Sequence, residues 1–153
     1  MIVLDSDVLV IDLRYPADAR YLVNRKVLDA LQLGSQHLII TCQTLLEIIG
    51  VVSFNSPAAW TADLPVKIPV WYAVEVVPSL QVHPVFANCS VDALIGIMVQ
   101  RCSLGDAIVL EQMRLFAPGA TLFLSWNARH FRGKLSIPAL TPEEWWRQNQ
   151  PVP

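Results

Sequence analysis

The apolar run at the start of the chain is the feature that most constrains its fold. Residues 1–4 lead without a polar break into Asp5, and apolar residues resume at Val8. Such a run is typical of a strand buried on both faces, as in a parallel sheet. Ligands of open α/β sheets bind at the carboxyl ends of the strands, where Asp5 would lie. A carboxylate buried there must be paired, hydrogen-bonded or bound to a cation. Alternatively, Asp5 or Ser6 caps the helix that follows.

The remaining chain alternates strand-like and helix-like segments. Further strands are predicted at 37–40, 80–83, 121–124 and 137–140. Helices are predicted to start near residues 7 and 16 and after the capping residues Thr41, Ser90 and Thr141, with one more around 105–110. This alternation predicts a three-layer α/β/α domain with a mostly parallel central sheet of four to five strands.

Two segments resist a simple interpretation. Residues 54–67 are expected to form a loop and the start of another element, with Pro57 and Pro65 as breakers. The β-branched content of residues 70–77 favours a strand, although the alternation leaves room for a helix there.

The length of 153 residues predicts one domain over 1–150, with a loose tail at 151–153. Apolar residues make up 54% of the chain, yet no run reaches the roughly 18–20 residues that span a bilayer. No basic segment precedes an apolar one at the start, so no signal peptide is expected. The apolar excess predicts a large core and an apolar surface that meets a partner, or alternatively only a core covered on both sides.

Cysteine use and charge narrow the function classes. The three cysteines are far apart in sequence, which argues against a zinc site or a disulfide framework and favours a reducing cytoplasm. The net charge of −2 argues against a broad basic face for nucleic acid.

Four polar groups stand out because of their apolar surroundings. Asp5 and Asn127 each follow an apolar strand, and Glu47 and Asp106 each interrupt an apolar helix face. Clustered carboxylates repel one another, and hard cations such as Mg²⁺ or Mn²⁺ suit such a cluster of oxygens. A cation bound there would activate a water and stabilise the leaving oxygen of a phosphodiester.

These segments resemble the PIN-domain nucleases, and among them the VapC-like ribonuclease toxins of toxin–antitoxin pairs. The resemblance is carried by residues 2–9, Glu47, 104–108, 125–131 and 137–144. It implies a single PIN-like domain in which Asp5 and Asp106 are direct ligands of Mg²⁺ or Mn²⁺ and Glu47 completes the acidic cluster. Asn127 occupies a position where the family often has Asp, and Ser6 occupies a small hydroxyl position that supports the site.

The implied activity is metal-dependent endonucleolytic cleavage of RNA in the cytoplasm. The resemblance also implies a cognate antitoxin that covers the pocket and a homodimer. The short apolar runs predict no membrane association. Two departures matter. Asn127 is uncharged, which leaves three carboxylates and weakens any second metal, and Asp92 is a rival to Asp106 within a similar sequence. The spacing to Asn127 favours Asp106.

A basic segment follows the proposed site. Arg129, Arg132 and Lys134 are permanent cations that would hold RNA phosphates, or alternatively belong to a solvated loop. His130 has the side chain of a general acid, but a metal-activated water does not need one.

Two other functions remain open. Asp5-Ser6-Asp7 after an apolar strand resembles the haloacid-dehalogenase-like phosphotransferases, in which Asp5 would be the nucleophile and Asp7 the acid/base. Alternatively, Asn127 and the low positive charge mark a catalytically weak or inactive PIN-like domain that acts by binding a partner.

Overall fold

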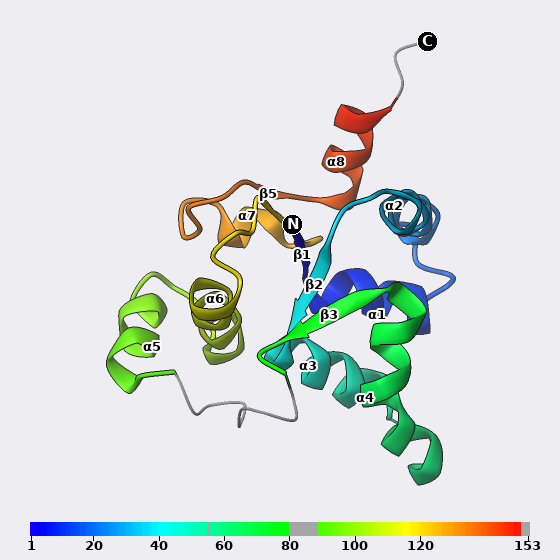
Figure 1. Ribbon diagram of the computed structural model, residues 1–153, viewed down its shortest axis with the longest axis horizontal. Helices are drawn as coiled ribbons and strands as arrows, with labels where there is room; N and C mark the ends of the chain where they lie inside the picture. Colours follow the sequence, from blue (N-terminus) through cyan, green and yellow to red (C-terminus); the bar gives the residue numbers. More distant parts are fainter. Residues whose placement is uncertain (55, 80–88, 151–153) are drawn as a thin grey trace.

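Five parallel strands form one sheet with helices on both faces, in a computed structural model that describes residues 1–54, 56–79 and 89–150 (Figure 1). The strands are β1 (Ile2–Leu4), β2 (Leu38–Thr41), β3 (Val74–Val77), β4 (Leu122–Leu124) and β5 (Ala139–Leu140), in the order β3-β2-β1-β4-β5. The helices are α1 (Ser6–Arg14), α2 (Tyr21–Leu33), α3 (Cys42–Val52), α4 (Ala58–Tyr72), α5 (Val91–Met98), α6 (Leu104–Phe116), α7 (Ala128–Phe131) and α8 (Pro142–Asn149). The predicted three-layer α/β fold is confirmed, and every strand pairing in the described residues is parallel.

The two faces of the sheet belong to separate apolar cores. In β1, Ile2 and Leu4 face a core built with α1, α2, α3, α4 and α8. Val3, between them, faces a second core built mainly with α6 and α7. Side chains alternate between the faces of a strand, so a central strand covered on both faces must be apolar throughout. The apolar run at the start of the chain follows directly from this position.

Local capping signals set most helix starts. The side chains of Thr41, Ser90 and Thr141 each accept a hydrogen bond from a first-turn N–H of α3, α5 and α8, as predicted. The first helix begins at Ser6 instead of Asp7, because Asp5 is its N-cap and accepts from the N–H of Ser6 at 2.8 Å.

The segment after α1 differs from the prediction. Pro16 lies in a turn, and α2 starts only at Tyr21. Asp18 explains the delay, because its carboxylate accepts from both the backbone and the guanidinium of Arg20 and so stabilises the turn.

Pro65 does not interrupt the helix, so the expectation that it acts as a breaker within residues 54–67 was wrong. Pro65 and Pro69 both lie inside the 15-residue helix α4. Leu64, Ile68 and Tyr72 recur on one face of that helix and are buried, so tertiary packing outweighs the lost backbone hydrogen bonds. The ambiguous stretch 70–77 is divided: α4 ends at Tyr72 and β3 begins at Val74.

Two expectations lie outside the described residues, namely the strand at 80–83 and the tail at 151–153. Within the described residues, no helix is both long and apolar enough to cross a bilayer.

The strand order creates a place for a site. The chain moves outward from β1 through β2 to β3, then returns to the other side of β1 with β4. Loops diverge at such a reversal, and ligands of parallel sheets bind there at the carboxyl ends of the strands. Leu4 pairs with Leu124, so Asp5 and Ser125 leave the sheet side by side at this point.

Candidate active site

Two aspartates lie at the carboxyl end of β1. Asp5 is buried, with 8% of its surface exposed. Asp7, one residue into α1, accepts hydrogen bonds from the Ser125 hydroxyl and from the backbone N–H groups of Trp126 and Asn127, each at 3.1 Å. Asp7 therefore ties the start of α1 to the turn after β4, and these bonds hold the two strand ends together.

Burial and like charge make this acid pair costly to ionise. Desolvation is the largest cause, and the neighbouring carboxylate of Asp7 the second, of a rise in the pKa of Asp5 to about 7. Hydrogen bonds from Ser125 and from the N–H of Ser6 oppose this rise, and the charge of Glu47 adds to it. Desolvation also raises the pKa of Asp7, against the hydrogen bonds from the β4 turn. A cation between these groups would relieve both desolvation and repulsion.

Glu47 reaches the same edge from α3. Its Oε1 accepts from the side-chain amide of Gln43 at 3.0 Å. A Cβ atom placed on Gly105 would lie 2.8 Å from that same Oε1. A side chain at this position would make the Glu47 carboxylate shift, so Gly105 lets α6 begin directly against Glu47 as it stands.

The contact between α3 and α6 is fixed by a buried amide. The side chain of Gln112, which is fully buried in α6, accepts from the backbone N–H of Gln43 at the start of α3 at 3.0 Å. This bond ties the first turn of α3 to the third turn of α6, while Gly105 at the start of α6 lies against Glu47.

Asp106 is engaged by its own helix and by a histidine. It forms a reciprocal capping box with Ser103, and its Oδ2 lies 3.1 Å from Nε2 of His130. That nitrogen is buried and has no hydrogen-bond partner of acceptable geometry among the described residues. Asp106 is therefore held by α6 and lies against His130 of α7, and a cation that bound it would compete with both.

The structure brings part of the predicted acidic group together. Asp5 interacts with Glu47, and Glu47 touches the first turn of α6. In the described part of the chain, however, no three Asp, Glu, His or Cys side chains converge closely enough to enclose a metal ion. The rival Asp92 is exposed in the first turn of α5.

The remaining predicted residues flank the acids. Ser6 follows Asp5 and donates its backbone N–H to it. Asn127 contributes its backbone N–H to Asp7, while its side chain lines a neighbouring cleft. Whether any of these residues serves catalysis stays a prediction.

That cleft is basic. It has a volume of about 370 Å³ and is lined by Gln100, Arg101, Asn127, Arg129, His130, Arg132 and Lys134. The basic segment that follows the site in sequence therefore forms one wall of a cleft. Arg132 is partly committed, because it forms an ion pair with Glu144 and donates to the carbonyl of Ala139 at 3.1 Å.

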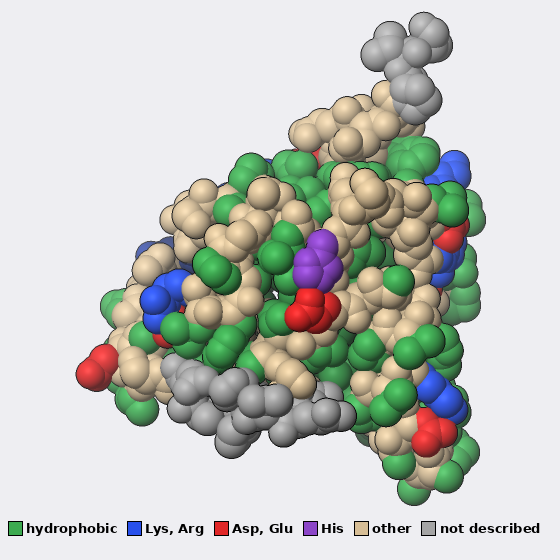
Figure 2. Space-filling view, in the orientation of Figure 1, with side chains coloured by type: hydrophobic (Ala, Val, Ile, Leu, Met, Phe, Trp, Pro, Cys, Tyr) green, Lys and Arg blue, Asp and Glu red, His purple; other side chains and the backbone are tan. Residues whose placement is uncertain are grey.

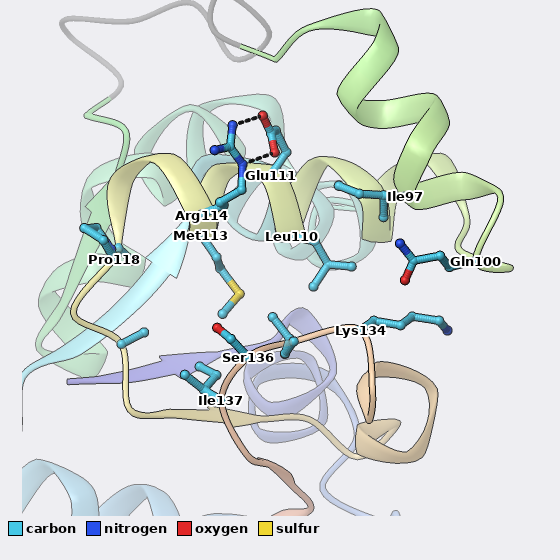
Figure 3. A pocket seen from close by; sticks show the side chains of 13 residues that line it. Ile97, Gln100, Leu110, Glu111, Met113, Arg114, Pro118, Lys134, Ser136 and Ile137 are labelled. Carbon is cyan, nitrogen blue, oxygen red and sulfur yellow. Dashed lines mark hydrogen bonds and ion pairs between the residues drawn. The ribbon is translucent and has the colours of Figure 1, made fainter.

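A larger cavity lies away from the acids. It has a volume of about 430 Å³, and its lining includes side chains of α6, the end of α5 and residues 134–137 (Figure 3). Leu110 and Met113 point into it, and the bidentate ion pair of Glu111 with Arg114 lies beside it. None of the predicted residues Asp5, Glu47, Asp106 and Asn127 lines this cavity, whereas Lys134 of the predicted basic segment does.

Apolar side chains also lie on the surface, and Figure 2 shows many of them spread over one face. On α4, Val66 and Val70 are 70% and 74% exposed. On α5, no residue is buried, and Val91 and Ile95 are more than half exposed. Part of the apolar excess of the sequence is therefore surface, as the first of the two interpretations expected.

Sequence reasoning missed three parts of this edge. The contacts of Asp7 with the turn after β4 cross more than a hundred residues of sequence. The approach of His130 to Asp106 and the place of Arg101 in the cleft depend on how α5, α6 and α7 pack. The paired acids in Asp5-Ser6-Asp7 were a usable signal for Asp7, whereas the sequence near Arg101 carries none.

Comparison with known proteins supports the fold. No protein-family model and no curated protein matches the sequence. Among solved structures, the crystal structure of Mycobacterium tuberculosis VapC20, a toxin that cleaves the sarcin-ricin loop, superposes with a TM-score of 0.52. The identity is 13% over 80% of this chain and 87% of that chain. The predicted PIN-like fold is therefore confirmed at the level of the fold.

Proposed function

We propose, on the premise of this PIN-like fold, that the chain is a divalent-metal-dependent endoribonuclease and the toxin of a toxin–antitoxin pair. The observation that carries the proposal is the buried acid pair of Asp5 and Asp7 at the sheet edge, whose hydrogen bonds compensate only part of the cost of burial. Asp5 is held beside Asp7 and near Glu47 at the cost of a strongly raised pKa. A fold that needed only a helix cap there would be more stable with Asn or Ser, which cap equally well without charge.

The donor set fits Mg²⁺ or Mn²⁺. Asp5, Glu47 and Asp106 offer carboxylate oxygens only, and hard divalent cations prefer such ligands. When bound, the cation supplies an activated water and stabilises the leaving oxygen of the phosphodiester. We assign Asp5 and Asp106 as direct ligands and Glu47 as the third acid.

The other residues position these groups. Asp7 and Ser125 hold the ends of β1 and β4 together, so that Asp5 is presented at a fixed depth. We assign the fourth site position, without a charge, to Asn127, and contacts with the substrate to Ser6 and Arg129. Arg132 contributes less than predicted, because Glu144 already neutralises it.

The hydrogen bonds of Asp7 argue against the aspartyl-phosphate alternative. A phosphotransferase of that type needs its second aspartate free to exchange a proton. Both oxygens of Asp7 accept hydrogen bonds from the turn after β4. The metal-dependent nuclease makes no such demand.

Cleavage of a labelled RNA with Mn²⁺ or Mg²⁺ tests the proposal. Asp5→Asn and Asp106→Asn should each lower the rate by more than the roughly 10–100-fold that loss of an outer-shell partner costs. Asp92→Asn is the matched control, because Asp92 is an exposed first-turn acid in a similar sequence, and it should cleave at the parental rate. Full activity of both site variants, or activity in excess EDTA, would contradict the proposal.

A homodimer and a cognate antitoxin complete the proposal. The exposed apolar residues of α4 and α5 are the surfaces that would support these contacts. Sedimentation equilibrium of the purified chain should give twice its 17.1 kDa mass. Growth arrest on expression, relieved by the protein encoded beside it, would support the toxin role.

A further inference from the structure

We infer that the basic cleft beside Asp106 binds the phosphodiester backbone of the RNA, and that Arg101 supplies a phosphate contact there. The identity of the ligand as RNA rests on the proposed function. The cleft lies between the turn that follows α5, which contributes Gln100 and Arg101, and the α7 region, which contributes Arg129 and Lys134.

The charge of the cleft is opposite to that of the chain. Four permanent cations line it, and no acidic residue does, although the net charge of the chain is −2. Arg132 is paired with Glu144, and Lys134 donates to the backbone carbonyl of His130. Arg101 and Arg129 have no ion-pair partner among the described residues, so their charges are free to meet a phosphate.

The backbone at Arg101 is an independent observation. Its φ is +64°, in the left-handed region that side chains other than Gly and Asn rarely adopt. The residue lies two positions beyond Val99, the C-cap of α5, and donates its N–H to the carbonyl of Met98. Arginine at a positive φ carries a conformational cost, and no ion pair of its side chain within the described residues offsets that cost.

The basic cleft adjoins the acidic residues at the carboxyl ends of β1 and β4. His130 lines the cleft and at the same time lies 3.1 Å from Asp106. Asn127 also lines it, while its backbone N–H bonds to Asp7. A strand with one phosphate at the acids would therefore place a neighbouring phosphate among the cations.

This position favours RNA over an acidic peptide. Both would be attracted by the arginines. The preference rests on the proposed function, in which the cation held by the neighbouring acids would engage the phosphodiester that is cleaved. The side-chain amide of Asn127 adds a hydrogen-bond donor for phosphate or sugar oxygens, while that of Gln100 already donates to the carbonyl of Gly96 at 3.4 Å.

Arg101→Gly separates binding from folding. Glycine adopts a positive φ freely, so the variant should melt at or above the parental temperature. Its affinity for a fluorescent single-stranded RNA, measured by anisotropy in EDTA, should fall roughly tenfold, as for one charge-assisted contact. The slope of log K against log salt should become shallower by about 0.7, the value for one phosphate on a single strand.

Three further arms complete the experiment. Arg129→Ala should show the same loss and guards against a folding artefact at position 101. Lys26→Ala, which removes an exposed cation of α2 outside the cleft, should bind RNA as the parent does. A glutamate-rich peptide of equal charge should not displace the RNA.

Parental affinity and salt slope in both arginine variants would overturn the inference, even if the parent cleaves RNA with Mn²⁺. Displacement by the acidic peptide would overturn the RNA assignment and favour a protein partner. Binding losses in both arginine variants, in a chain that cleaves no RNA, would support the cleft and reject the nuclease proposal. The experiment can therefore reject RNA binding by the cleft without rejecting the nuclease proposal, and the reverse.

Discussion

Asp5→Asn should stabilise the metal-free protein at alkaline pH. Asparagine has the shape of aspartate and caps helices equally well, so its Oδ1 can still accept the N–H of Ser6. What the substitution removes is a negative charge that is buried beside Asp7 and near Glu47.

The magnitude follows from the pKa of Asp5. Folding raises it from 3.8 to about 7, and each pKa unit corresponds to about 1.4 kcal/mol. Ionised Asp5 therefore costs the folded state about 4 kcal/mol above pH 7. Exchanging charge-assisted hydrogen bonds for neutral ones returns about 1–2 kcal/mol, which leaves a net gain of about 2–3 kcal/mol.

The pH dependence has a definite sign. Between about pH 4 and pH 7 the folded state keeps a proton on Asp5 that the unfolded chain has released, so the parent loses stability as pH rises through this range. Asparagine has no titrating carboxyl group, so the stability of the variant does not change through this titration. The difference between variant and parent should therefore be largest at pH 8 and small near pH 5.

Thermal unfolding in EDTA at pH 5 and pH 8 measures the effect. The gain at pH 8 corresponds to a melting temperature about 5–10 °C higher. Asp63→Asn on the exposed surface of α4 is the matched control and should change stability by less than about 0.5 kcal/mol. Added Mn²⁺ should stabilise the parent and not Asp5→Asn. A variant that is equally destabilised at both pH values would refute the argument that Asp5 carries a buried, uncompensated charge.

Two further predictions concern the contact of Gly105 with Glu47 and the hydrogen bond between Tyr72 and Asp12. Gly105→Ala should weaken Mn²⁺ binding at least tenfold in calorimetry, because its Cβ would displace Oε1 of Glu47, whereas Gly50→Ala has open space and should keep the affinity and gain up to about 1 kcal/mol of stability. Equal affinities in the two variants would disprove the role of the Glu47 contact. Tyr72→Phe removes a 2.7 Å hydrogen bond to Asp12, whose Oδ1 already lacks a partner among the described residues, and should cost about 1–3 kcal/mol in urea unfolding. An unchanged urea midpoint would contradict that reading.

Features governed by neighbouring residues were predictable. The strand at residues 2–4, the cap at Thr41 and the capping box of α8 follow from short patterns, because each depends on hydrogen bonds or burial within a few residues. The alternation of such segments led to the parallel three-layer fold, since parallel strands need helical crossovers.

Features that depend on distant packing were not predictable. Pro65 interrupts a helix in isolation, but the burial of Leu64 and Ile68 keeps α4 intact. Asp18 postpones α2 through a turn that competes with the helix start at Pro16.

The candidate site divides in the same way. Asp5, Glu47 and Asp106 were recognisable because each is a charge in an apolar setting, and burying a charge demands a reason that the sequence displays. Their neighbours were not recognisable. Asp7 meets the turn after β4 across more than a hundred residues, and Arg101 joins Arg129 only through the packing of α5 and α6. The sequence by itself determined which acids are unusual and that a parallel sheet would carry them. Only the tertiary structure decided which charges face one another, because contacts between distant segments depend on how the helices pack on the sheet.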